Sequence, residues 1–349
     1  MRSSPRASLR VIRWLVILAV LATVGYTAGF FAYGFFAGAP EYLSGEPRAI
    51  GCETPGSRFG WTYAAVNYVP ASDELLNIHP DASSCAGRLS TAGTDVVSPD
   101  GVHIAGWYVP MAGSEVSLDP SKPASGATVV LVHGGKSNAS GMLDYAVALH
   151  AAYNLLIVDL RNSGRSGTAE STGGLREQGD LRAMLDWLER TKNPRWIAVL
   201  GNSNGAATAL AEARTDVRVK ALVLDSMHAS LEWQLGNVIE SEKHLPAWPG
   251  AWGVMVGVQA RLGESVGSVD PIRTIVQVMG RPMLLTHGSA DAIDRPADSL
   301  DRNVAAAQAA GISIEVHLCD GAGHGKVVMV CAADWTRWVQ TFLAAHGGM

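Results

Sequence analysis

The chain alternates between short apolar runs and segments whose apolar residues recur every three or four positions. Runs rich in Val, Leu and Ile are typical of strands buried on both faces of a sheet, and the segments between them are typical of amphipathic helices. The clearest runs lie at residues 128–133, 154–160, 197–200, 219–225, 282–286 and 312–318. Strands separated by helices imply right-handed crossovers, so the pattern predicts a mostly parallel, doubly wound α/β sheet.

Two segments depart from this alternation. Residues 96–97 and 103–109 are predicted to be strands joined by a Pro-Asp-Gly turn, and they are candidates for an antiparallel edge. Residues 227–280 form an insertion that carries Trp233, Trp248 and Trp252. The insertion either packs on the outside of the sheet or forms a lid with apolar walls for a substrate, because ligands of such sheets bind beyond the carboxyl ends of the strands.

The N-terminal region has the pattern of a membrane helix. Residues 14–38 contain no charged side chain. As a helix, this segment is long enough to cross a hydrocarbon core of about 30 Å. The basic residues of the predicted cytoplasmic tail 1–13 precede it: Arg2, Arg6, Arg10 and Arg13. This arrangement predicts a single-pass anchor with the remaining chain outside the cytoplasm. A signal peptide cleaved near the small residues 37–39, which would give a secreted protein, and a buried core helix are the alternatives.

Residues 39–94 are predicted to be an extracytoplasmic spacer with little periodicity, containing Cys52 and Cys85. Four cysteines allow three pairings. We expect the local pairs Cys52 with Cys85 and Cys319 with Cys331, since an oxidising compartment favours disulfides. Zinc bound by Cys319, His324 and Cys331 is an alternative, but their spacing matches no common zinc module, so no metal is predicted. A net charge of −5 argues against nucleic acid as a partner.

A candidate nucleophile lies at the junction of a predicted strand and a predicted helix. Residues 201–205 read Gly-Asn-Ser-Asn-Gly, which matches G-x-S-x-G in the strand-turn-helix context that gives this pattern its meaning. We expect the tight turn to hold Ser203 in a strained backbone conformation. A second match at 263–267 contains Ser265, but no strand precedes it, so we interpret Ser265 as part of a loop.

A serine hydroxyl needs a base, and the base needs a carboxylate. His324 lies in a glycine-rich loop after the last predicted strand, and Asp291 follows the strand before it. We therefore predict the triad Ser203, Asp291 and His324. Asp294 is the main alternative to Asp291, and Asp225, at the end of residues 219–225, is a weaker one.

The tetrahedral intermediate also needs fixed hydrogen-bond donors. The backbone N–H of Asn204, at the predicted start of a helix, is one candidate. The second is expected in the loop after residues 128–133, where Gly135 follows His133 and Gly134 and lacks a side chain that would block close approach.

These motifs together resemble the α/β-hydrolases, over residues 95–345. They are His-Gly-Gly at 133–135, Asp-Leu-Arg-Asn-Ser-Gly-Arg-Ser-Gly at 159–167, the elbow at 201–205, Leu-Val-Leu-Asp-Ser at 222–226, His-Gly-Ser-Ala-Asp at 287–291 and Gly-Ala-Gly-His-Gly at 321–325. The order of the set is closest to membrane-anchored or exported hydrolases of the esterase, lipase and serine-peptidase-like branch. The resemblance implies the same triad and oxyanion donors, although Asn204 stands where many members have a larger apolar residue.

The sequence thus predicts a serine hydrolase that cleaves a carboxylic ester through an acyl-enzyme. Its partner would be a small or lipid-like acyl substrate, and no cofactor is expected. A peptidase, a thioesterase or an acyltransferase would use the same triad, and a catalytically idle hydrolase fold that only binds is a further alternative.

Overall fold

A computed structural model describes residues 5–37, 53–68, 95–114, 126–278 and 280–347. Cys52 and Cys85, with the expected disulfide between them, lie outside the described residues, as does most of the expected spacer.

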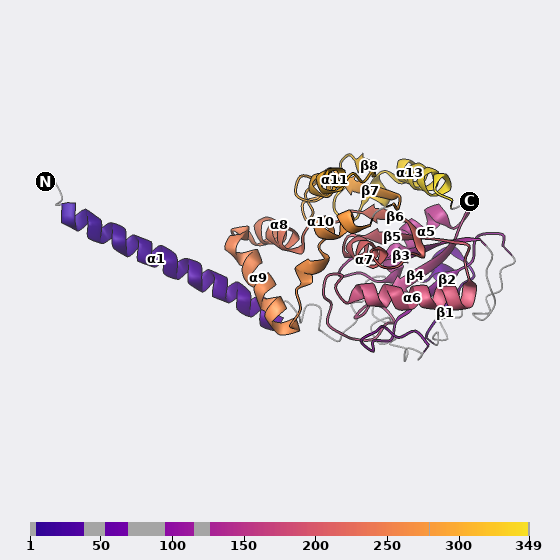
Figure 1. The fold of residues 1–349 in the computed structure, drawn as a ribbon, viewed down its shortest axis with the longest axis horizontal. Helices are drawn as coiled ribbons and strands as arrows, with labels where there is room; N and C mark the ends of the chain where they lie inside the picture. The colour runs from indigo at the N-terminus through magenta and orange to yellow at the C-terminus, as the bar shows by residue number, and fades with distance from the viewer. Residues whose placement is uncertain (1–4, 38–52, 69–94, 115–125, 279, 348–349) are drawn as a thin grey trace.

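The described part contains an eight-stranded sheet of order β1-β2-β4-β3-β5-β6-β7-β8 (Figure 1). β1 and β2 run antiparallel to their neighbours, and β3 to β8 are parallel to one another. The strands are β1 (Ala64–Val66), β2 (Ala105–Val109), β3 (Ala127–Val132), β4 (Asn154–Asp159), β5 (Trp196–Asn202), β6 (Val219–Asp225), β7 (Met283–Gly288) and β8 (Glu315–Cys319). The mostly parallel, doubly wound sheet predicted from the apolar runs is confirmed.

Helices cover both faces of the sheet because successive strand residues point to opposite sides. Val130 and Val132 of β3 belong to one apolar core, and Val129 and Leu131 to the other. The first core is closed by α6 (Glu177–Lys192), α7 (Asn204–Ala213), η5 (Ile275–Gln277) and α11 (Leu300–Ala309). The short helix α10 (Pro271–Thr274) directly precedes η5. The second is closed by α3 (Pro55–Phe59), η3 (Ala139–Met142), α5 (Leu143–Leu149), α12 (Val327–Val330) and α13 (Ala332–Ala345).

The antiparallel edge differs from the one expected at residues 96–97 and 103–109. Val97 and His103 form only an isolated bridge, and the strand of the second segment is β2. Its antiparallel partner is β1, which lies within the stretch expected to be a spacer. The sheet therefore begins before Asp95.

A long helix, α1 (Pro5–Ala32), continues into the π-helix η1 (Tyr33–Ala37) and projects from the domain (Figure 1). Within it, 25 residues from Ile12 to Phe36 have a mean hydropathy of 2.1, and the most apolar stretch is not buried in the protein. This helix is long and apolar enough to cross a membrane, a property that signal sequences share.

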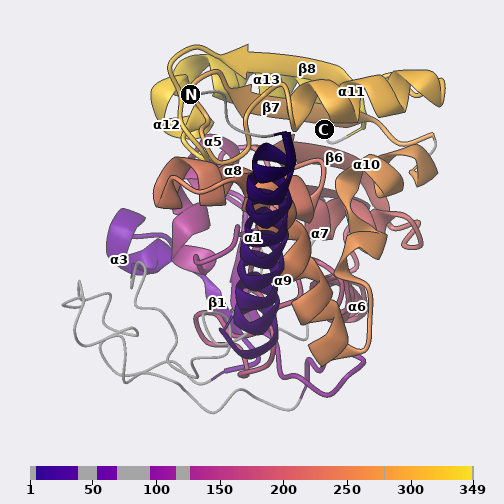
Figure 2. The ribbon, with the colours of Figure 1, turned by 90° about the vertical axis from the view of Figure 1, so that its left-hand side faces the viewer.

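The insertion after β6 consists of α8 (Leu231–Lys243), α9 (Ala247–Leu262) and η4 (Val266–Val269), followed by α10 and η5. Both views of the ribbon place α9 beside the C-terminal end of α1 (Figures 1 and 2). The insertion therefore starts at the carboxyl end of β6 and leads into β7.

Candidate active site

Ser203 lies in a sharp turn between β5 and α7. Its φ of 52° and ψ of −120° are unusual for a residue with a side chain, which confirms the expected backbone strain. A Cβ atom at Gly201 would collide with the backbone of Gly205 and Ala206, and one at Gly205 would collide with the carbonyl oxygen of Val132. Glycine at both positions therefore lets α7 start directly against the sheet.

His324 lies in the loop after β8 and faces this serine. Its Nε2 atom is 2.8 Å from the Oγ atom of Ser203, and its Nδ1 atom is 2.8 Å from Oδ2 of Asp291. Asp291 comes from the loop after β7. The structure thus joins three residues from the ends of three strands in one hydrogen-bonded chain.

The loop backbone holds the carboxylate of Asp291. Its Oδ1 atom accepts hydrogen bonds from the backbone N–H groups of Ile293, at 3.0 Å, and Asp294, at 2.8 Å. Asp291 can therefore orient the imidazole of His324 and stabilise its protonated form.

Asp294 is also close to His324 but is held differently. Its Oδ2 atom lies 3.6 Å from Nδ1 of His324 and accepts a hydrogen bond from Nε2 of Gln234, on α8, at 2.9 Å. Its Oδ1 atom is buried without a hydrogen-bond partner. Burial, reinforced by the charge of Asp291, raises the pKa of Asp294 to about 7, although His324 opposes the shift.

The pKa of His324 reflects two opposing effects. Burial lowers it, but the hydrogen bond to Asp291 and the negative charges of Asp294, Asp291 and Asp225 outweigh burial, so the pKa is raised above its ordinary value. A base with this property gains proton affinity from its carboxylate neighbours.

The loop after β3 lies against the elbow. A Cβ atom at Gly134 would be 3.1 Å from Cβ of Ser203, and one at Gly135 would be 2.6 Å from Nδ2 of Asn204. Asn204 is the first residue of α7, where amide groups have no partner within the helix. The structure therefore places Gly134 next to Ser203, and Gly135 next to the side chain of Asn204. The contact of Gly134 was not predicted, although it is part of the same His-Gly-Gly motif.

A buried polar network around Asp225 lies next to the turn that carries Ser203. The Oη atom of Tyr145 donates to Oδ2 of Asp225 at 2.5 Å, and Nδ2 of Asn202 donates to Tyr145 at 2.9 Å. Thr286 donates to the other oxygen of Asp225 at 2.9 Å, while the N–H of Ser203 donates to the backbone carbonyl of Asp225. Asp225 thus belongs to this network and makes no direct hydrogen bond to His324. The sequence carried no signal for Tyr145, because it lies within a helix between two motifs and belongs to neither.

Comparisons with known proteins agree with this architecture. Residues 127–268 match the family described as alpha/beta hydrolase fold. The structure of the Pyrococcus furiosus esterase Pf2001 is similar with a TM-score of 0.60, covering 86% of this chain and 97% of that chain at 20% identity. The dipeptidyl peptidase 4 of Porphyromonas gingivalis gives a TM-score of 0.53, covering 71% of this chain and 34% of that chain at 15% identity.

The chain has the α/β-hydrolase fold. In sequence it is 29% identical over 168 residues to the uncharacterized protein YqkD of Bacillus subtilis, covering 47% of this chain and 55% of that protein. It is 27% identical over 208 residues to the uncharacterized protein YfhR of Escherichia coli O157:H7, covering 58% of this chain and 63% of that protein. The matches therefore span less than two thirds of the length of either relative.

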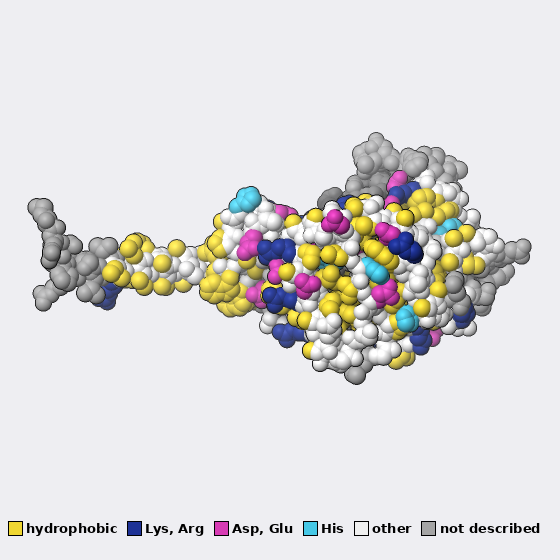
Figure 3. Space-filling view, turned by 90° about the horizontal axis from the view of Figure 1, so that it is seen from above, with side chains coloured by type: hydrophobic (Ala, Val, Ile, Leu, Met, Phe, Trp, Pro, Cys, Tyr) yellow, Lys and Arg dark blue, Asp and Glu magenta, His cyan; other side chains and the backbone are white. Residues whose placement is uncertain are grey.

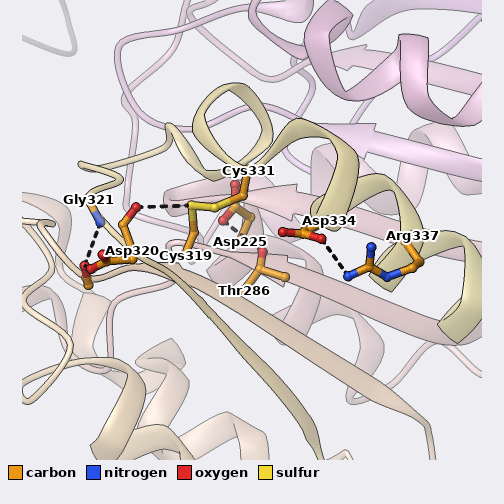
Figure 4. The surroundings of a disulfide bond; sticks show 9 residues. Asp225, Thr286, Cys319, Asp320, Gly321, Cys331, Asp334 and Arg337 are labelled. Atoms are coloured by element: carbon orange, nitrogen blue, oxygen red, sulfur yellow. Dashed lines mark hydrogen bonds and ion pairs between the residues drawn. A yellow bond between two sulfur atoms is a disulfide. The ribbon is translucent and has the colours of Figure 1, made fainter.

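In this α/β-hydrolase fold, a disulfide closes the loop that carries His324. Cys319, the last residue of β8, is bonded to Cys331, which lies 12 residues later and precedes α13 (Figure 4). The hydroxyl of Ser289 also holds the start of this loop. It donates a hydrogen bond to the carboxylate of Asp320 and accepts one from the backbone N–H of Gly321. The local pairing predicted for these two cysteines is present. Their sulfur atoms are therefore not available as zinc ligands.

Within the described part of the chain, no three His, Cys, Asp or Glu side chains are grouped so that they could hold a metal ion. Ser265, from the second G-x-S-x-G match, is exposed in a loop before η4. It lies at no strand end, in agreement with its interpretation as a loop residue.

The insertion contacts the loop that carries the acids. Besides the bond from Gln234 to Asp294, Nδ2 of Asn237 donates to the carbonyl oxygen of Ile293 at 2.9 Å. Both donors are on α8. The N-terminal half of α8 therefore packs beside the loop that carries Asp291 and Asp294.

Proposed function

We propose that this chain is a serine hydrolase that cleaves a carboxylic ester through an acyl-enzyme. The observation that carries the proposal is the continuous chain of hydrogen bonds from Asp291 through His324 to Ser203, with both steps at 2.8 Å. Nucleophile, base and orienting acid lie in the order and at the distances that this chemistry requires.

The proposed mechanism gives each group a defined role. The Oγ atom of Ser203 attacks the ester carbonyl while Nε2 of His324 takes the hydroxyl proton, and Asp291 stabilises the imidazolium. The N–H groups of Asn204 and Gly135 bind the oxyanion of the tetrahedral intermediate. His324 then gives its proton to the departing alcohol, leaving an acyl group on Ser203. Water attacks this acyl group with His324 again as the base, which releases the acid and restores the serine.

We further propose that α1 anchors the protein in a membrane with the hydrolase domain outside the cytoplasm. The basic residues before the apolar stretch support this orientation. The disulfide between Cys319 and Cys331 supports an oxidising compartment. The contacts of α1 with α9 support retention of α1, because cleavage after it would remove a helix that packs against the domain.

Hydrolysis of a panel of substrates by the full chain tests the activity. We expect turnover of p-nitrophenyl esters of increasing acyl length, with little turnover of aminoacyl p-nitroanilides, and loss of both in Ser203→Ala. Faster turnover of the anilides would identify a peptidase instead. A folded wild-type protein that cleaves neither class would favour a binding module.

A further inference from the structure

Helix α9 packs on the last turns of α1 through glycines. A Cβ atom at Gly250 would lie 3.0 Å from Oη of Tyr26, and one at Gly253 would lie 2.9 Å from the carbonyl oxygen of Thr27. A Cβ atom at Gly257 would lie 2.8 Å from the backbone nitrogen of Phe35. Glycines that let the backbones of two helices approach closely are typical of helix pairs in membranes.

Polar contacts at both ends fix α9 along α1. The Oη atom of Tyr26 donates to the carbonyl oxygen of Pro246 at 2.5 Å, just before α9. At the other end, Nη1 of Arg261 donates to the carbonyl oxygen of Phe35 at 3.0 Å. The two helices therefore run in the same direction, and the depth of α1 in a membrane also determines the depth of α9.

The side of α9 that faces away from the domain is apolar and exposed. The exposed fractions of Trp248, Trp252 and Val256 are 73%, 48% and 37%. No charged residue occurs between residues 247 and 260. Figure 3 shows hydrophobic side chains gathered where the long helix joins the domain. We call Trp248, Trp252 and Val256 the α9 edge.

We infer that the α9 edge lies in the lipid bilayer that α1 crosses, in the leaflet on the side of the hydrolase domain. This inference rests on the proposed anchoring by α1. The edge continues the apolar surface of α1, whose Phe31, Tyr33 and Phe36 are exposed beside it, so the bilayer that surrounds α1 also reaches α9.

The nearby charges determine how deep α9 lies. Glu240, Glu242 and Lys243 are exposed at the end of α8, a few residues before Trp248. Charged groups are expensive in the hydrocarbon core, whereas tryptophan is enriched at the membrane interface. The charges at the end of α8 therefore oppose deep insertion of the start of α9, and the contact between Pro246 and Tyr26 passes this limit on depth to α1.

This position defines the substrate class of the proposed hydrolase. The α8–α9 hairpin reaches from the bilayer to the loop that carries Asp291. On α8, Gln234 donates a hydrogen bond to Asp294, and Asn237 donates one to the carbonyl oxygen of Ile293. An ester that resides in the bilayer would reach Ser203 along this hairpin without crossing bulk water. We therefore infer that the substrate is an acyl ester of a membrane lipid.

An environment-sensitive fluorescent amino acid at position 252 tests the location of the edge. The full chain is reconstituted in phosphatidylcholine nanodiscs with and without a lipid that carries a nitroxide near the head group. We expect blue-shifted emission and about twofold or stronger quenching by the nitroxide lipid. The matched control is the same probe at position 217, where Val217 is 71% exposed just before the amino end of β6. There we expect emission typical of water and no quenching.

Three outcomes would overturn the inference. Water-like, unquenched emission at 252 would show that the edge does not reach lipid. Blue-shifted emission without quenching, together with chemical cross-linking between chains, would show that a second copy covers it. A chain that does not enter nanodiscs would remove the anchor. Fluorophosphonate labelling of the same samples reports the serine chemistry separately, so failure here is distinguishable from failure of the proposed activity.

The double variant Trp248→Ser/Trp252→Ser tests the substrate class. We expect hydrolysis of a long-chain ester embedded in vesicles to fall about tenfold, because interfacial binding scales with buried apolar area. Hydrolysis of soluble p-nitrophenyl acetate should not change, since neither tryptophan contacts the triad. An equal loss on both substrates, or no loss on either, would contradict a lipid substrate delivered along α9.

Discussion

Asp291 and Asp294 both lie near Nδ1 of His324, and the proposed mechanism assigns them different tasks. Asp291 has the shorter contact and accepts two backbone hydrogen bonds, whereas Asp294 is held by Gln234 and has an unpartnered oxygen. We expect Asp291→Asn to lower kcat by about 10⁴-fold, because the imidazole loses the partner that fixes its tautomer. The matched variant Asp294→Asn should lose far less. Steady-state kinetics of both variants measures the difference, and the reverse order would make Asp294 the orienting acid.

The raised pKa of His324 predicts the pH dependence of the activity. The base must be neutral to accept the serine proton, so kcat/KM should fall as the pH drops through the pKa of His324, with a midpoint above the ordinary value for histidine. Asp294 contributes to this raised pKa through the negative charge that it carries when ionised, and its own pKa of about 7 limits that contribution at lower pH. In Asp294→Asn the imidazolium loses that stabilisation, so the acidic limb of the profile should move to lower pH. A midpoint that stays in place or moves upward in this variant would contradict the assigned coupling.

The residues of the proposed triad could be located from the sequence because their types and positions are set by strand ends. Ser203, Asp291 and His324 each follow a buried strand, and parallel strands bring their carboxyl ends to one edge. The sequence favoured Asp291 but left Asp294 as the main alternative, because both lie in the same loop. The choice depends on which carboxylate the backbone N–H groups of residues 293 and 294 reach.

At the scale of elements, the strand-turn-helix junction depends on the absence of side chains. We expect Gly205→Ala to destabilise the protein by about 1–3 kcal/mol or more, since its Cβ would collide with the carbonyl oxygens of Val132 and His133. Gly323→Ala is the control, because no atom lies within 4 Å of the added Cβ. Calorimetry should show a lower Tm for the first variant and little change for the second. Equal Tm values would contradict the tight packing of the elbow.

Most parallel strands could be predicted from their apolar runs, and β6 agrees with the predicted range at both ends. β1 was missed because it has only three residues, two of them half-buried alanines, and it pairs with a strand about forty residues later. The role of Gly250, Gly253 and Gly257 was also missed. Their spacing has meaning only beside α1, which lies more than two hundred residues earlier in the chain.

At the scale of the whole molecule, α1 and the hydrolase domain form one unit through α9. We expect the full-length protein to stay with the membrane during extraction at alkaline pH, because only a spanning helix resists this treatment. A variant that begins after residue 38 serves as the control and should be soluble or released. Release of the intact chain, or recovery of only a shortened chain that has lost α1, would contradict the anchor.

The central claim is that Ser203 is the nucleophile of an α/β-hydrolase, and covalent labelling tests it most directly. The full chain in detergent is treated with a fluorophosphonate, and the labelled residue is located by peptide mass spectrometry. We predict a single adduct on Ser203, absent from Ser203→Ala and strongly reduced in His324→Gln, while Ser265→Ala labels like the wild type. An adduct on another residue, or labelling that persists in Ser203→Ala, would contradict the claim.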